Sequence, residues 1–255
     1  MRLRLLVLGV VGLVAVAAAC VFLFQRQIGE ATFRQAVDEN VGRDRAAELP
    51  DGLHVFVCGS GSPMPDALRA GPCLGVVAGG HVIVVDVGSG GPRRLARMGF
   101  PVGRIEKVYL THLHSDHIDS LGELMLQAWV GGSRGQPLPI AGPQGVEDVV
   151  AGFNAAYRID STYRTAHHGA DVANPAGFGG VAEIIPAPVG PGKAAVIHDQ
   201  DGVKITVIGV DHAPVEPAFG FRIDYKGRSV VISGDTTYSA ELVAAAKDTD
   251  VLLHE

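Results

Sequence analysis

The run Thr111-His112-Leu113-His114-Ser115-Asp116-His117 gathers three histidines and one aspartate within six residues. In an extended backbone His112 and His114 project to the same side, because residues i and i+2 share one face of a strand. A single metal ion can therefore bind both imidazoles. Asp116 and His117 fall on an incoming helical turn and project towards a second point a few ångströms away. The spacing predicts two neighbouring metal ions, and four polar side chains on a solvated corner are the weaker interpretation.

Zinc suits a mixture of imidazole and carboxylate ligands. Manganese or iron also fit, because no thiolate narrows the choice of metal. The three cysteines of the chain are too few for a thiolate site or a disulfide framework. Cys58 and Cys73 leave two interpretations open, a disulfide formed in an oxidising compartment or two small buried side chains.

The metal-binding run lies at a strand-to-helix corner. Val108 and Leu110 alternate as on a strand that leads directly into His112. Behind the run, apolar residues recur at helical spacing and predict a helix that starts near Ser115 or Asp116. The residues at this spacing are Leu121, Leu124, Met125, Ala128 and Trp129.

Other predicted strands of the chain also end in histidine or aspartate. Strand pairs are expected from residue 53 onwards and around the turn at Lys226-Gly227, and they alternate with helices, which indicates a layered α/β domain. Polar residues that follow strands gather along one edge of the sheets, where α/β folds usually hold their sites. The strands over 81–87, 203–207, 228–233 and 251–253 bring Asp86, His212, Asp235 and His254 to this edge.

The first 28 residues are expected to form a membrane anchor. Leu5 to Phe24 is uncharged and long enough to cross a bilayer as a helix. Arg2 and Arg4 precede it, which places the N-terminus in the cytoplasm and the catalytic domain on the extracytoplasmic side. The alternative is a cleaved signal peptide, which would give a secreted or periplasmic protein. Residues 29–52 are interpreted as a juxtamembrane linker and residues 53–255 as the domain.

The composition fits a folded, acidic domain. Hydrophobic residues make up 47% of the 255 residues, enough for a proper core. After position 28 there are 18 basic and 27 acidic residues, a net charge of −9. Such a domain is a poor electrostatic match for a polyanion, which disfavours RNA as a partner. Residues 142–192 are the loosest stretch, and the Gly/Pro-rich part Asn174–Lys193, with a single lysine, is expected to project as a loop or arm.

The His-x-His-x-Asp-His run resembles the signature of the metallo-β-lactamase superfamily. Asp86 resembles the family's first motif, which supports the metal ligands without binding metal. Three further segments resemble the ribonuclease Z branch or the superfamily's later motifs. They are the Gly-Pro turn in Pro139–Pro143, the surroundings of His212, and the segment Ser233-Gly234-Asp235-Thr236. Leu252-Leu253-His254-Glu255 resembles the start of the motif whose histidine assists Asp116 in proton transfer.

The resemblance implies a four-layer αββα sandwich and a binuclear metal centre. His112, His114 and His212 would hold the first ion, Asp116 and His117 the second, and Asp235 would bridge the two. Two Zn²⁺ ions, or Mn²⁺ or Fe, would share a hydroxide that attacks the substrate, with Asp116 and His254 as catalytic residues. The resemblance further implies a homodimer. Family members carry one more histidine ligand beyond the position of His254, so the chain is interpreted as lacking its C-terminal end.

Three functions are compatible with these motifs. The first is a phosphodiesterase of ribonuclease Z type, a 3'-tRNA-processing endoribonuclease-like enzyme. The second is an arylsulfatase or another small-molecule ester hydrolase on the same fold, acting on a sulfate ester or a small diester. The third is a non-hydrolytic metal-binding or redox member of the superfamily. His167 and His168 are candidates for substrate contacts, although an exposed loop pair is an equal interpretation.

Overall fold

The computed structural model describes residues 2–40, 44–189 and 192–255, which form two compact units, 1–43 and 44–255. Parts of three expected segments lie outside the described residues: Met1 of the anchor, residues 41–43 of the linker and residues 190–191 of the arm. The second unit begins at Asp44 and so includes residues 44–52 of the predicted linker. The backbone N–H of Arg45 donates to the Gly99 carbonyl at 2.8 Å, and Asp44 pairs with Arg104 at 2.7 Å.

The N-terminal unit consists of two helices, α1 (Arg2–Leu23) and α2 (Gln25–Asn40). Within the described residues, neither helix alone is long and apolar enough for a membrane span. Leu8–Leu23 and Gln25–Gln35 satisfy the length and composition limits only as a pair, and this pair is bent by 71°. The expected single membrane-spanning helix is therefore not confirmed.

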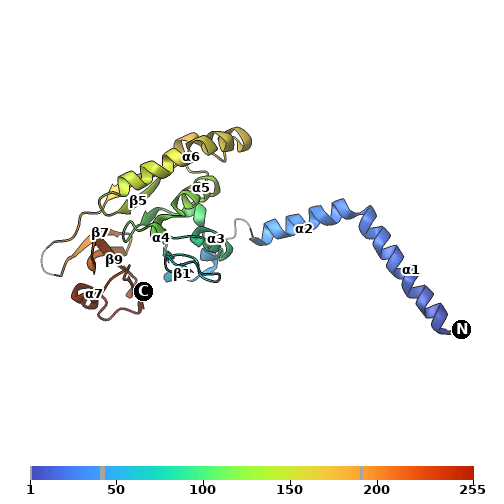
Figure 1. Cartoon of the computed structure of the whole chain (residues 1–255), viewed down its shortest axis with the longest axis horizontal. Helices are drawn as coiled ribbons and strands as arrows, with labels where there is room; N and C mark the ends of the chain where they lie inside the picture. The colour runs from blue at the N-terminus through green and yellow to red at the C-terminus, as the bar shows by residue number, and fades with distance from the viewer. Residues whose placement is uncertain (1, 41–43, 190–191) are drawn as a thin grey trace. The chain divides into compact units, whose positions relative to one another are not determined.

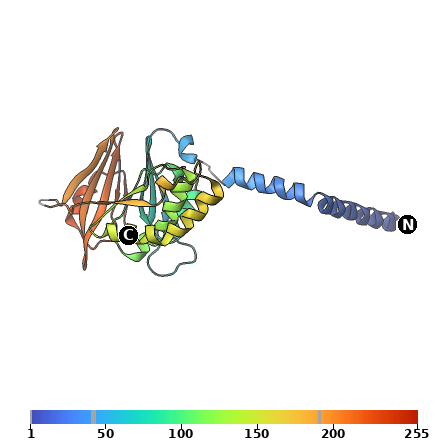
Figure 2. The same cartoon turned by 90° about the horizontal axis from the view of Figure 1, so that it is seen from above.

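The second unit contains two mixed sheets that face each other (Figures 1 and 2). In the first sheet, β1, β2 and β3 are antiparallel neighbours, and β3, β4, β5 and β6 run parallel to one another. In the second sheet, β7, β8, β9 and β10 are antiparallel neighbours, and β11 runs parallel to β10. The first sheet has the order β1 (Leu53–Gly59), β2 (Cys73–Ala78), β3 (His81–Val87), β4 (Lys107–Tyr109), β5 (Leu138–Gly142) and β6 (Gly180–Ile184). The second has the order β11 (Val251–Leu253), β10 (Arg228–Ile232), β9 (Val215–Tyr225), β8 (Val203–His212) and β7 (Ala194–Gln200).

Helices cover the outer faces of both sheets, which gives the expected four-layer arrangement. Three helices pack on the first sheet and α7 (Ala240–Ala245) packs on β8 of the second (Figure 2). The helices on the first sheet are α3 (Gly91–Arg97), α5 (Leu121–Gly131) and α6 (Val146–His168). The short α4 (Ser115–Ile118) contains Asp116 and His117 of the metal-binding run, and 3₁₀ turns lie at η1 (Arg45–Glu48), η2 (Val102–Arg104) and η3 (Pro175–Gly177).

The burial of β3 explains how the layers are joined. Val82 and Val84 belong to the core between the first sheet and its helices, whereas Ile83 and Val85 belong to the core between the two sheets. Successive side chains of a strand point to opposite faces, so a strand buried on both sides reads as a continuous apolar run. Phe219 and Phe221 of β9, both fully buried, fill the inter-sheet core from the other side.

Two expectations about the segments near the site need correction. The expected helix after the metal-binding run is two helices, α4 and α5, separated at Asp119 and Ser120. The stretch 142–192 is not loose, because it contains the 23-residue helix α6 and the strand β6. In helix α6 only Val146 and Val150 are buried. A helix with so little buried surface needs few apolar residues on one face, and its sequence therefore gives a weak helical pattern.

The two open interpretations of the cysteine pair are also resolved by the structure. Cys58 and Cys73 form a disulfide, and both residues are buried. The bond joins the end of β1 to the start of β2 and closes the loop between them.

Candidate metal centre

The candidate site lies at the edge where strands of both sheets end. Strand β4 leads into His112, β8 ends at His212, and β10 leads into Asp235. The N–H of Phe219 in β9 donates to the Thr111 carbonyl at 2.9 Å and so ties the second sheet to the metal-binding run. The predicted convergence of strand ends on one edge is confirmed.

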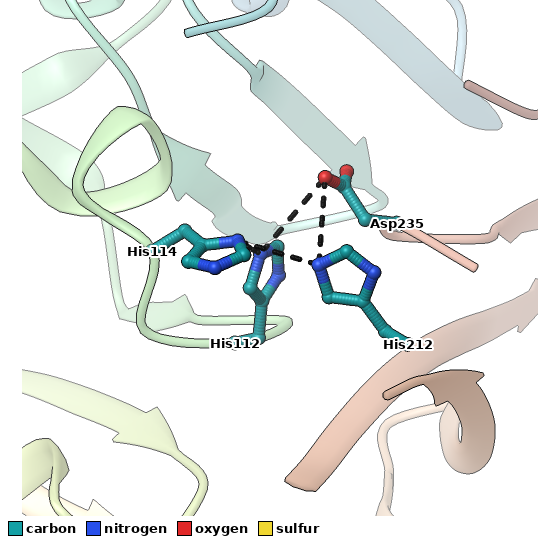
Figure 3. A group of neighbouring side chains, drawn as sticks. All are labelled: His112, His114, His212 and Asp235. Carbon is teal, nitrogen blue, oxygen red and sulfur yellow. Dashed lines mark hydrogen bonds and ion pairs between the residues drawn. The ribbon is translucent and has the colours of Figure 1, made fainter. Parts of the chain in front are cut away.

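Four of the predicted ligands form a compact group (Figure 3). His112, His114, His212 and Asp235 each offer one donor atom, and these atoms all lie within 4.8 Å of one another. His114 Nδ1 lies 2.9 Å from His112 Nε2 and 3.3 Å from His212 Nε2. Asp235 Oδ2 lies 4.0 Å from His112 Nε2 and 3.9 Å from His212 Nε2. Nitrogen and oxygen ligands of one tetrahedral zinc lie roughly 3.3 Å apart, so this donor set fits such an ion.

A second set of donors adjoins the first. The Nε2 atom of His117 lies 3.3 Å from Asp235 Oδ1 and 3.8 Å from Asp116 Oδ2. This nitrogen is buried, yet it has no hydrogen bond of acceptable geometry among the described residues. Buried polar atoms nearly always have a partner, and a second ion would supply one. The two oxygens of Asp235 thus face different donor sets, as a bridging carboxylate requires.

Asp86 supports the ligands from behind, as the sequence implied. This buried carboxylate accepts hydrogen bonds from the Thr111 N–H and the Thr111 hydroxyl, both at 2.8 Å. Its Oδ2 atom also lies 2.9 Å from His117 Nδ1. A carboxylate on the far nitrogen of a histidine fixes the tautomer and the ring orientation, so that Nε2 is left to bind metal.

Burial and neighbouring charges shift the pKa values of this group in opposite directions. Burial, together with the His117 imidazole, lowers the pKa of His112 to about 3, so this ring is neutral and has a free lone pair. Burial also disfavours a charged His117, but Asp235 and Asp86 outweigh it and raise its pKa to about 10. The neighbouring His117 lowers the pKa of Asp235. The carboxylates therefore create a site that favours positive charge.

Glycines let two loops approach the backbone of Asp116 closely. A Cβ atom added at Gly88 would lie 2.4 Å from the Asp116 carbonyl oxygen, and one added at Gly71 would lie 3.1 Å from it. Real Cβ atoms do not approach another atom to 2.4 Å, so any side chain at Gly88 would displace this loop. The disulfide and the close approach of Gly71 hold the β1–β2 loop beside the metal-binding run, and the close approach of Gly88 does the same for the segment after β3.

His254 lies next to the segment that carries Asp235. The Ser233 N–H donates to the Leu253 carbonyl at 3.0 Å, and the Thr236 N–H donates to the Glu255 carboxylate at 2.5 Å. The His254 imidazole itself contacts the Glu255 carbonyl at 3.0 Å. Among the described residues its ring makes no hydrogen bond to Asp116, so its role in proton transfer stays a prediction.

The structure does not bring His167 and His168 to the metal centre. Both are exposed and stack edge to face at the C-terminal end of α6. The other end of this helix adjoins the centre, because a Cβ atom added at Gly145 would lie 3.1 Å from Leu113. A helix rises about 1.5 Å per residue, so the pair lies roughly 30 Å along the axis from this contact.

Thr111 is a functional residue that the sequence pattern did not reveal. It is fully buried, and its hydroxyl lies 3.1 Å from His112 Nδ1 and 3.4 Å from His117 Nδ1 as well as bonding Asp86. One side chain thus contacts a ligand from each donor set. Its place between the strand and His112 was visible in the sequence, but its burial was not.

Comparison with known proteins agrees with this geometry. Residues 68–253 match the model of the metallo-beta-lactamase superfamily. The chain is 43% identical over 204 residues to a ribonuclease Z of Mycobacterium avium (strain 104), covering 79% of the chain and 69% of that relative. It is 41% identical over 203 residues to a ribonuclease Z of Mycobacterium sp. (strain KMS), covering 79% and 68%.

Solved structures show the same fold at lower identity. Human tRNase Z, short form, aligns with a TM-score of 0.58 and 24% identity, covering 78% of this chain and 76% of that one. The metallo-beta-lactamase fold protein YhfI from Bacillus subtilis aligns with a TM-score of 0.55 and 22% identity, covering 80% and 70%.

Replacing Asp86 by asparagine should weaken zinc binding by about 10- to 100-fold, the usual effect of losing the outer partner of a histidine ligand. The amide keeps the shape of the carboxylate but loses its charge and one acceptor oxygen. The dissociation constant, measured by competition with a chromophoric chelator, checks this. Asp119→Asn is the matched control, because the Asp119 carboxylate accepts from the Ser89 hydroxyl and, among the described residues, makes no hydrogen bond or ion pair with a predicted ligand. Unchanged affinity in a folded Asp86→Asn variant would contradict the supporting role of Asp86.

Proposed function

We propose that this chain, which belongs to the metallo-β-lactamase superfamily, is a metal-dependent phosphodiesterase of ribonuclease Z type that cleaves RNA. The observation that carries the proposal is the convergence of His112, His114, His212 and Asp235 within 4.8 Å. Two curated relatives at 41% and 43% identity are named ribonuclease Z, which supports RNA as the substrate class. The sequence disfavoured RNA because the net charge is acidic. Salt screens the charges that lie far from the site, so this net charge has little effect on a substrate bound there.

The donor sets support two divalent ions, for which zinc is the best match. His112, His114 and His212 would hold one ion, Asp116 and His117 the other, and Asp235 would contact both. When bound, such ions lower the pKa of water towards neutrality and stabilise the negative charge that develops on the phosphoryl oxygens.

The remaining tasks fall to the chain's own residues. Asp86 and Thr111 orient His117 and His112, so the ligands need little rearrangement when substrate binds. The complete burial of His112 keeps water away from the inner side of the centre. We propose that His254 donates a proton to the ribose oxygen that leaves when RNA is cleaved. His254 follows β11 and lies beside the segment that carries Asp235.

Replacing both His112 and His114 by alanine should lower hydrolysis of bis-p-nitrophenyl phosphate and of precursor tRNA by at least about 100-fold. Removing the hydrogen-bond partner of a metal ligand typically lowers activity about 10- to 100-fold, and removing the ligands themselves should lower it more. The assay uses the full chain with added zinc or manganese. Chelation of the metal should have the same effect, and added zinc should reverse it.

His54→Ala is the matched control for this experiment. The His54 imidazole contacts the Pro50 carbonyl at 2.7 Å, so its removal leaves the metal centre intact and activity unchanged. Turnover of p-nitrophenyl sulfate without turnover of either phosphodiester would overturn the proposal and favour an arylsulfatase. Full activity in the His112 and His114 double variant would exclude this metal centre as the active site.

His254→Ala should separate substrates by their leaving groups. General acid catalysis contributes roughly 10²- to 10⁴-fold, and the ribose oxygen of RNA needs the proton on leaving, whereas p-nitrophenolate leaves without it. We therefore expect kcat on precursor tRNA to fall within that range and kcat on bis-p-nitrophenyl phosphate to change much less. Equal losses on both substrates would argue that His254 shapes the site and does not supply the proton.

We further propose that residues 1–28 hold the chain to a membrane, with the domain on the extracytoplasmic side. The uncharged stretch Leu5–Phe24 supports a membrane-associated segment by its composition. The Cys58–Cys73 disulfide supports an oxidising compartment, because disulfides rarely persist in a reducing cytosol.

Expression in a bacterial host tests this location. The chain should sediment with membranes, resist extraction by alkaline carbonate, and become accessible to protease when only the outer membrane is opened. A variant that begins at Asp44, the start of the second compact unit, should lose membrane association. Recovery of the intact chain in the soluble fraction, or of a soluble chain whose mass shows removal of the first residues, would exclude the anchor.

A further inference from the structure

A second group of ionisable side chains lies at the opposite end of the sandwich from the candidate metal centre. His81 opens β3, Glu106 precedes β4, His198 lies near the end of β7, and Asp201 follows in the turn to β8. Strands rise about 3.3 Å per residue, so six residues from Glu106 to His112 span roughly 20 Å. None of these four side chains takes part in the candidate centre.

His81 is held in one orientation by a carboxylate. Its Nδ1 atom lies 2.8 Å from Glu106 Oε2, and its Nε2 atom lies 3.7 Å from Asp201 Oδ2. The first distance matches the 2.9 Å between His117 Nδ1 and Asp86 in the candidate centre. The second is close to the 3.9 Å between His212 Nε2 and Asp235. His81 therefore has the carboxylate partner that a metal-binding histidine normally has on its far nitrogen.

His198 completes the group. The rings of His81 and His198 have centroids 5.6 Å apart and planes inclined at 74°. His114 and His212, two ligands of the candidate centre, have centroids 5.1 Å apart at 89°. Two imidazoles on one tetrahedral zinc have centroids about 5 Å apart, so the His81–His198 pair is somewhat wider and needs a small rotation of the rings to share an ion. Within the described part of the chain, the His198 ring has no hydrogen-bond or ion-pair partner.

The surroundings leave room for a ligand and disfavour the charged form of His198. A pocket of about 350 Å³ opens between the sheets, and its lining includes His81, Glu106 and His198. Partial burial lowers the pKa of His198, and the neighbouring His81 and Lys107 lower it further. The ammonium group of Lys107 pairs with Glu183 at 2.5 Å, which offsets its repulsion of a cation.

The turn that carries Asp201 has a defined shape. Asp201 and Gly202 both have positive φ, 51° and 82°. Two consecutive residues of this kind form the tight turn that Asp-Gly favours in hairpins. The exposed Asp201 carboxylate can therefore adjust its rotamer while its backbone stays fixed beside His81.

We propose that His81, His198 and Asp201 bind one Zn²⁺ ion, with Glu106 orienting His81. The ion joins the start of β3 in the first sheet to the β7–β8 turn in the second. It is a structural ion that is separate from the candidate metal centre, and the proposal does not depend on the proposed function.

Zinc stoichiometry of the full chain tests this site. After dialysis against buffered Zn²⁺, elemental analysis should find one zinc fewer per chain in the His81→Ala/His198→Ala variant than in the wild type. Phosphodiesterase activity at saturating zinc should be unchanged. His54→Ala is the matched control, because among the described residues the hydrogen bond of this imidazole goes to the Pro50 carbonyl, and this variant should keep the wild-type stoichiometry.

A second measurement isolates the site from the candidate centre. In a background in which His112, His114, His117 and His212 are all replaced by alanine, Zn²⁺ should still raise the midpoint of thermal unfolding, because an ion that binds only the folded chain stabilises it. Glu106→Gln, which keeps the fold but weakens the support of His81, should raise the zinc dissociation constant about 10- to 100-fold in this background. Equal stoichiometry in wild type and the His81/His198 variant, or no stabilisation by Zn²⁺, would overturn the proposal.

Discussion

The metal centre depends on one buried carboxylate, that of Asp86. A buried charge is stable only when it is paired and hydrogen-bonded, and Asp86 meets this condition through Thr111 and His117. The same bonds fix the backbone at Thr111, whose carbonyl accepts from Phe219 of the second sheet. These bonds align the two sheets so that the strand ends that carry the polar residues lie at the same edge. His212 and Asp235, which the second sheet carries, arrive opposite His112 for that reason.

The ligand positions could be predicted from the sequence because each follows a strand whose pattern is local. The apolar run of β3 and the alternation in β8 identify these strands, and the next polar residues then fall at one edge. The opposite orientation of the two Asp235 oxygens could not be read from the sequence. It depends on where β10 ends relative to His117, which is a contact between distant segments.

Sequence patterns failed at three places, each for an identifiable physical reason. Helix α6 was missed because its exposed second half has little apolar periodicity, and the pair His167 and His168 was therefore interpreted either as substrate contacts or as an exposed loop pair. The disulfide could not be decided from spacing, since it depends on the β1–β2 register that sets Cys73 opposite Gly59, the neighbour of Cys58. A hydrophobic stretch such as Leu5–Phe24 predicts a helix, which α1 confirms, but among the described residues α1 alone is not long and apolar enough for the expected membrane span.

The net charge of −9 after position 28 is a weak argument against an RNA substrate. Two divalent ions would offset four of these charges at the place where the substrate binds. Unpaired surface charges act over a screening length of about 8 Å at physiological salt, so distant acidic residues contribute little at the centre. The local arrangement of donors, and not the overall balance of charge, therefore determines which phosphodiesters can bind.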